Sequence, residues 1–308
     1  MATAMATEEP MSQSRPAALP ALALNLARNW AMLAALLWSG SAAAITPPAE
    51  DSLLNPVGGK PLAISLDAEL GFLAPIANTI QFDHDGTKFD YIEDGGQEIL
   101  FPFLRLQTSL DVGKRETFVF LYQPLDLQTE VVLDQDVTED TVTFPANSTL
   151  NLRYGFSFWR GTWLHELLPA PEKELAIGLG LQLRNADISF ESGDGTVRFS
   201  ERDVGPVPLF AARTRFPVGK RGFFGAEASG SYAPIKYLNG ANVDVVGALL
   251  DASVKGGFTL RHGADVYACV RYIGGGAEGT SKNPDGLGDG YTANWLSFTS
   301  LSLGAELR

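Results

Sequence analysis

The chain has 308 residues, of which 19% are charged, a smaller share than the roughly 25% usual in soluble proteins. Its formal net charge is −13, and it has no cluster of Lys and Arg, which excludes a nucleic-acid partner because phosphates need concentrated positive charge. Cys269 is the only cysteine, so an intrachain disulfide and a CxxC metal or redox motif are also excluded.

The N-terminal segment has the parts of a secretory signal peptide. Basic residues precede the apolar run WAMLAALLW (30–38), and an Ala-x-Ala site ends at Ala44. The run is too short to cross a bilayer as a helix, which takes about 20 residues. We predict a cleaved signal peptide over 1–44 and a short, Pro-rich lead-in over 45–61.

From residue 62 onward, segments that alternate apolar and polar residues are separated by turns. In ISLDAELGF, we expect Ile64, Leu66, Leu70 and Phe72 to share a lipid-facing side, because successive side chains of a strand point to opposite faces. Most segments are longer than the usual soluble strand of about five or six residues, and a membrane strand needs about 9–11. We predict ten strands: 62–75, 98–111, 116–132, 148–166, 174–190, 207–217, 222–235, 242–260, 264–276 and 291–308.

Short and long connections alternate along the chain. The short ones are DVGKRE, LLPAPEKE, FPVGKRGF and LRHGAD, and the long ones include the polar stretches that follow the first strand and ESGDGTVRFSERDVGP. In an up-and-down sheet, this order puts all tight turns at one end and the long loops at the other. The repeated VGKR (112–115 and 218–221) is interpreted as a tight turn, in which Gly provides a permissive φ.

The polar faces are rich in Gly, Ser, Gln and Arg rather than the Lys and Glu of a water-facing surface. In the fourth strand, Leu150, Leu152, Tyr154, Phe156 and Phe158 oppose Arg153 and its polar neighbours, and we expect the polar row to face an enclosed lumen. The charged residues predicted to line that lumen are Asp67, Glu69, Arg105, Arg153, Arg184, Arg213, Arg215, Glu227, Asp251, Lys255 and Arg271.

These features resemble the outer-membrane β-barrels of Gram-negative bacteria over 62–308. The final SLSLGAELR is similar to the terminal strand signal of that class, although it ends in Arg308 instead of an aromatic residue. The resemblance implies an all-β fold, an antiparallel up-and-down transmembrane β-barrel of about ten strands, with eight to twelve fitting the pattern. It also implies location in the cell outer membrane, tight turns in the periplasm, and outer-membrane lipid and the barrel-assembly machinery as partners.

Enzymatic sites find little support in the sequence. The first long loop carries Asp83, His84 and Asp85, but the later long loops hold no second pair of an acidic residue and His. No GxSxG elbow occurs, and the acidic stretches DQDVTED and NPDGLGDG do not match an EF-hand loop. We therefore predict no enzymatic activity, no metal and no cofactor.

The predicted bore is narrow, because about eight strands are filled by their own side chains and sixteen or more leave a channel. We expect a non-enzymatic envelope protein, either a porin-like narrow pore for small solutes or a structural or surface-interaction barrel that meets extracellular ligands at its long loops. The alternatives are a secreted soluble β-barrel or lectin-like binding protein and, less favoured, an outer-membrane lipid hydrolase or protease.

Overall fold

The computed structural model describes residues 62–168, 173–234, 245–260, 263–280 and 289–308. The predicted signal peptide and lead-in lie outside these residues. Within them, no helix is long and apolar enough to span a membrane. The strands are β1 (Leu62–Phe82), β2 (Phe89–Asp90), β3 (Phe101–Val112), β4 (Glu116–Gln123), β5 (Asp126–Val132), β6 (Val137–Glu139), β7 (Val142–Phe144), β8 (Thr149–Glu166), β9 (Glu174–Ser192), β10 (Arg198–Val218), β11 (Gly222–Pro234), β12 (Val246–Thr259), β13 (Asp265–Thr280) and β14 (Tyr291–Leu307).

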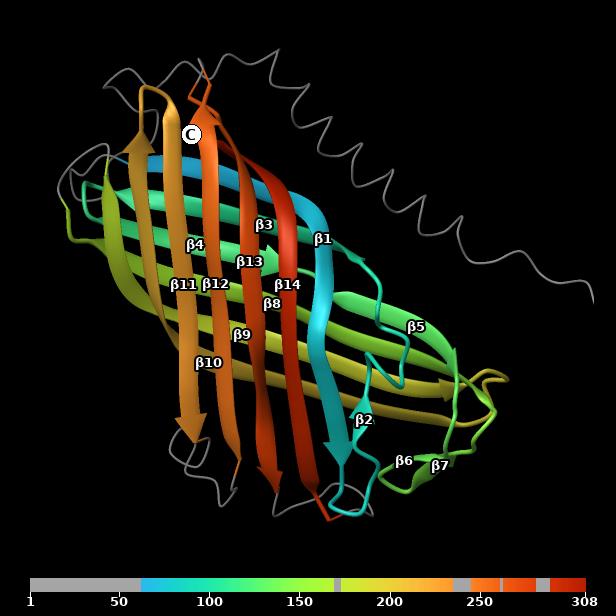
Figure 1. Cartoon of the computed structure of the whole chain (residues 1–308). Helices are drawn as coiled ribbons and strands as arrows, with labels where there is room; N and C mark the ends of the chain where they lie inside the picture. Colours follow the sequence, from blue (N-terminus) through green and yellow to red (C-terminus); the bar gives the residue numbers. More distant parts are fainter. Residues whose placement is uncertain (1–61, 169–172, 235–244, 261–262, 281–288) are drawn as a thin grey trace, which may run out of the picture. The chain divides into compact units, whose positions relative to one another are not determined.

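The main sheet is antiparallel and closes on itself, because β14 pairs with β1 along almost its whole length. Figure 1 shows β14 and β1 side by side, where the first and last strands of the barrel meet. β4 and β5 pair with successive parts of β8 and so occupy a single position in the wall. The result is a closed ten-stranded barrel, which confirms the predicted fold class.

The connections define two ends of the barrel. At the end that we call the turn end, Leu62 and Leu307 lie beside the tight connections, and Gly113 and Gly219 of the two VGKR turns have φ angles of 70° and 66°. This left-handed region is open to Gly without a Cβ clash. At the opposite loop end, β2 and the hairpin of β6 and β7 follow the barrel strands (Figure 1).

Several strands extend further toward the loop end than the alternation predicts. β1 continues to Phe82 across an irregularity between Pro75 and Ala77. The extra residue of such a bulge reverses the inward and outward positions, so Asp67 and Glu69 are buried below it, and Asn78 and Ile80 above it. The predicted loop ESGDGTVRFSERDVGP is also mostly strand, because β9 runs to Ser192 and β10 begins at Arg198.

The polarity of the wall inverts along the barrel. The outward residues of β9 from Leu175 to Leu183 are apolar and exposed. This stretch is long enough for a tilted membrane strand, which needs about 9–11 residues. Beyond it, Asn185 points outward, while Ile188 and Phe190 point inward and are buried. The wall therefore leaves the apolar environment after Leu183.

The same inversion corrects the prediction for β8. Its apolar row at the loop end faces inward and is at most 5% exposed (Leu150, Leu152, Tyr154, Phe156 and Phe158). Arg153, which we expected in the lumen, lies on the outer face with its side chain 41% exposed. This part of β8 lies beyond the apolar belt, so its polar face meets water and its apolar face packs inside.

An apolar cluster fills the loop end of the barrel, and we call it the loop-end core. It combines wall residues with side chains from the connections, among them Phe89, Tyr91 and Phe144. The Phe89 and Phe190 rings pack edge to face with centroids 5.3 Å apart, and the Tyr91 and Tyr154 rings do so at 5.4 Å. The connections thus place large apolar side chains in the core at the loop end.

Candidate functional site

A network of buried charged side chains crosses the bore, and we call it the bore network: Glu69, Arg105, Arg160, Asp251 and Arg271. Asp251 is its centre and accepts hydrogen bonds from Arg160 and Arg271 at 2.8 Å each and from Arg105 at 3.2 Å. Arg271 also donates to Glu69 at 2.8 Å. The side chains are at most 4% exposed, so each charge is stabilised by its partners and hardly by water.

Neutral side chains complete the bore network. Gln123 accepts from Arg105 at 2.9 Å, Gln182 accepts twice from Arg160 at 2.9 and 2.7 Å, and Ser302 donates to Glu69 at 3.0 Å. These contacts use most of the donors and acceptors that the ion pairs leave without a partner, while Arg271 Nε and Gln123 Nε2 have no hydrogen-bond partner among the described residues. Such satisfaction is what makes buried charge tolerable, since a buried ion without partners is strongly unfavourable.

More ion pairs lie between the bore network and the turn end. Arg213 pairs with Glu174, Arg215 with Asp265 at 2.8 Å, and Lys255 with Glu227 at 3.3 Å. The Tyr267 hydroxyl donates to both oxygens of Asp67 at 2.7 Å, and the Lys255 ammonium lies 4.8 Å from the centroid of the Tyr267 ring.

The structure places ten of the eleven predicted lumen residues on the inner face: Asp67, Glu69, Arg105, Arg184, Arg213, Arg215, Glu227, Asp251, Lys255 and Arg271. Arg153 is the exception, and it pairs on the outer face with Asp126 and Asp187, both at 2.9 Å. Sequence reasoning missed Arg160. Its signal was a charge in the same alternating row as Phe156 and Phe158, a row that we had expected to face lipid.

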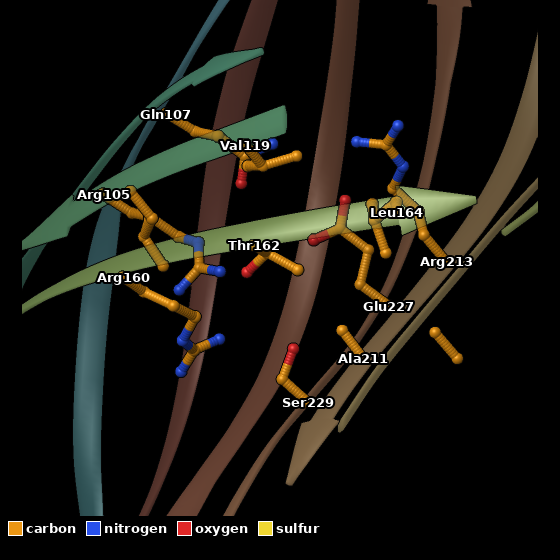
Figure 2. Close-up of a pocket in the computed structure, with 12 residues that line it drawn as sticks. Arg105, Gln107, Val119, Arg160, Thr162, Leu164, Ala211, Arg213, Glu227 and Ser229 are labelled. Carbon is orange, nitrogen blue, oxygen red and sulfur yellow. The ribbon is translucent and has the colours of Figure 1, made fainter. Parts of the chain in front are cut away.

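A small cavity lies beside the bore network. Figure 2 shows Arg105 and Arg160 on one side of it, and Arg213, Glu227 and Ser229 on the facing side. Its volume is about 40 Å³, which is room for a few water molecules at the roughly 10–15 Å³ that one needs. The space is far smaller than the roughly 300–1,000 Å³ of ordinary ligand pockets.

The outer face around these charges is apolar. Phe210, Phe258, Leu301 and Leu303 are all more than half exposed, and so is Leu179, which pairs with Phe210 on the neighbouring strand. A closed barrel with an apolar outer belt and a charged interior is built for lipid, because closure leaves no unpaired sheet edge in the hydrocarbon. The chain has the fold of an outer-membrane β-barrel.

A second polar cluster lies at the loop end of this outer-membrane barrel. His84 Nδ1 is 2.6 Å from Asp289 Oδ2, and the His84 ring stacks on Tyr291 with centroids 4.0 Å apart. The backbone N–H of Asp289 donates to Asp83 at 2.9 Å. His84 and Asp289 are both well exposed, so the pair is open to solvent.

The carboxyl groups of this cluster have shifted pKa values. The backbone N–H of Tyr291 and the His84 ring hold the pKa of Asp289 below its usual range. Partial desolvation and the nearby Asp289 carboxylate raise the pKa of Asp83. Sequence analysis missed the pairing of His84 with Asp289, because the two residues are 205 positions apart in separate loops.

The described residues contain no group of three or more His, Cys, Asp or Glu that could hold a metal ion. Of the stretch NPDGLGDG, only Asp289 and Gly290 fall within the described residues. Of the stretch DQDVTED, Glu139 is buried in β6.

Several solved outer-membrane proteins are similar to this chain in fold. The outer membrane protease OmpT of Escherichia coli is 11% identical with a TM-score of 0.47, over 82% of this chain and 98% of that one. The attachment invasion locus protein Ail of Yersinia pestis is 9% identical with a TM-score of 0.33, over 79% and 99%. OprG of Pseudomonas aeruginosa is 13% identical with a TM-score of 0.31, over 81% and 98%. No family model matches the sequence, and no curated protein does.

Proposed function

We propose that the chain is a non-enzymatic outer-membrane protein with a closed bore, which serves the cell envelope as a structural or surface-interaction barrel. The observation that carries the proposal is the bore network, in which Asp251 on β12 joins Arg105 on β3 and Arg160 on β8 across the interior. The loop-end core lies above this network. The bore network and the loop-end core are two successive barriers, and they favour a closed barrel rather than a narrow pore.

The energetics favour the same reading. An ion that passed the bore network would have to separate Asp251 from its arginines, and leaving a buried charge unpaired costs about 3–5 kcal/mol. An aqueous channel of constant width also needs polar walls along its length, whereas the loop-end core is apolar. The interaction surfaces of the protein would then be the loops and the polar outer face at the loop end.

Single-channel recording in planar bilayers tests the closed bore. We expect no conductance from the purified wild-type protein. Replacing both Arg105 and Asp251 by alanine should give rare, small openings, because this double substitution removes two side chains of the barrier and leaves Arg160 and Arg271 without their shared carboxylate. Regular conductance steps from the wild-type protein would overturn the proposal in favour of a pore for small solutes.

We further propose that the chain is exported through its N-terminal signal and inserted with the turn end toward the periplasm, the orientation usual for short turns in this class. The mass of the mature protein should correspond to a chain that begins at Ile45. The unboiled protein should migrate differently in SDS from the boiled protein. A detergent-free soluble protein with no such shift would favour the alternative of a secreted soluble barrel.

A hydrolytic activity at the loop end is the second candidate, and the pair of His84 and Asp289 is the observation that favours it. An Asp-oriented His beside a second carboxylate, Asp83, is an arrangement that can activate water. Purified protein should then cleave a general peptide or lipid-ester substrate, and His84→Ala should abolish the cleavage. Absence of any cleavage by the wild-type protein would leave the non-enzymatic proposal standing.

A further inference from the structure

A groove runs along the lipid-facing side of the barrel where β3, β4, β8 and β9 lie next to one another. Its volume is about 620 Å³, within the roughly 300–1,000 Å³ range of small-molecule sites. Its apolar outward lining side chains are Leu110, Phe118, Phe120, Trp163, Leu179 and Leu181, and Thr108 and Gly161 complete the outward lining. The groove lies outside the barrel wall and is separate from the bore network.

Gly161 is the reason for the hollow. It pairs with Phe120 on one side and with Leu181 on the other, and the next outward row contains Phe118, Trp163 and Leu179. A Cβ at Gly161 would meet no atom within 4 Å. One missing side chain in a field of large apolar ones thus leaves a slot that hydrocarbon can enter.

Polar groups mark the turn end of the groove. The Trp163 indole N–H donates to Glu116 at 2.7 Å, and His165 Nδ1 is 2.9 Å from the same carboxylate. Tryptophan with an apolar ring and a bonded N–H is typical of the boundary between hydrocarbon and head groups. Just beyond this boundary, Lys114 and Arg115 are exposed in the β3–β4 turn.

We propose that this groove binds a phospholipid with an anionic head group, of the phosphatidylglycerol type, from the leaflet at the turn end. One acyl chain would lie over Gly161 between Phe120 and Leu181, and the phosphate would meet Lys114 and Arg115. The belt faces hydrocarbon, so acyl chains are the ligands at hand there, and the cations complement a phosphate. A stable contact with a second copy of the chain buries roughly 1,000 Å² of surface or more. A slot set by one glycine does not by itself provide that area.

The test is native mass spectrometry of the purified full chain in detergent with added phosphatidylglycerol. Wild-type protein should retain one phosphatidylglycerol, and Gly161→Leu should lower its affinity by about tenfold or more, a loss of about 1.4 kcal/mol. The matched control is Gly256→Leu on β12. Gly256 is also a belt glycine, with Phe223 O the nearest atom to an added Cβ at 4.0 Å. This control should bind as wild type does.

The head-group contact has its own matched control, because VGKR occurs twice. Lys114→Gln with Arg115→Gln should weaken phosphatidylglycerol binding to the level of phosphatidylcholine, whereas Lys220→Gln with Arg221→Gln in the other VGKR turn should not. Phe120→Ala, which removes a wall of the groove, gives a second variant if Gly161→Leu does not insert. The heat-dependent gel shift reports folding for every variant.

Three results would overturn the proposal. In the first, wild-type protein retains no phosphatidylglycerol. In the second, Gly161→Leu and Gly256→Leu retain it equally. In the third, Gly161→Leu loses a dimer instead of a lipid, which would assign the groove to a second copy. None of these results depends on whether the bore conducts.

Discussion

The turn-end half and the loop-end half of this barrel are built from the same strands with opposite chemistry. Near the turn end, Leu179 faces outward and Gln182 inward; near the loop end of the same strand, Asn185 faces outward and Phe190 inward. The alternation is equally regular in both halves. What differs is the surrounding medium, so the period of a strand identifies its two faces and the medium decides which of them is buried.

The largest expected effect of a substitution concerns the charges at the centre of the turn-end half. Asp251→Ala would leave Arg105, Arg160 and Arg271 without their shared carboxylate, so we expect a loss of about 3–5 kcal/mol in the free energy of unfolding. Denaturant unfolding in detergent, followed by the heat-dependent gel shift, measures it. A loss below about 1 kcal/mol would mean that water reaches Asp251 and that the interior is wetter than the structure indicates.

An intermediate effect is expected in the loop-end half, at Glu139. This residue is fully buried in β6, and burial raises its pKa to about 9. The folded protein therefore holds a proton that the unfolded chain releases near pH 4.5, and stability falls as the pH rises between these values, by at most about 1.4 kcal/mol per pH unit.

Protease digestion at several pH values measures this effect. We expect the β6–β7 hairpin of the wild-type protein to be cut faster at pH 9 than at pH 6, while Glu139→Gln, which carries no titrating proton, removes the difference. Cleavage of the wild-type protein that is equal at both pH values would show that Glu139 does not titrate in the folded state.

The smallest effect is expected for the ion pair on the outer face. Arg153→Ala removes contacts to Asp126 and Asp187 that are partly exposed to solvent, and such pairs contribute about 0–1 kcal/mol. The same unfolding measurement as for Asp251→Ala puts the two halves on one scale. A loss for Arg153→Ala as large as that for Asp251→Ala would contradict the proposed contrast between a solvent-exposed outer face at the loop end and a buried charge network in the bore.

Much of the fold could be predicted from the sequence, because a period of two and the spacing of turns are local properties. The ten strand positions and the closed sheet follow from them. Which face of a strand points into the barrel is not a local property, because it depends on the surrounding medium. For this reason the alternation alone predicts Arg153 to point inward and does not identify Arg160. The bulge at Ile76 hid the upper part of β1, since one inserted residue breaks the alternation that identifies a strand.

The candidate sites were less predictable than the strands. Charges on the inner face could be named one by one, but the partners that meet across the bore, such as Arg105 and Asp251, are 146 positions apart. The pair of His84 and Asp289 joins two loops from opposite ends of the chain. The outer groove depends on Gly161, and a glycine in a strand gives no sign of what lies beside it.

The seam between β1 and β14 has a consequence for how the protein assembles. Glu69 on β1 is held by an ion pair with Arg271 on β13 and by a hydrogen bond from Ser302 on β14, so the first strand acquires these partners from the last two. Contacts of such long sequence separation form slowly, and until they form, Glu69 is without these partners. Pairing of β14 with β1 therefore also brings Ser302 to Glu69, so closing the seam and completing this part of the inner polar network are one event.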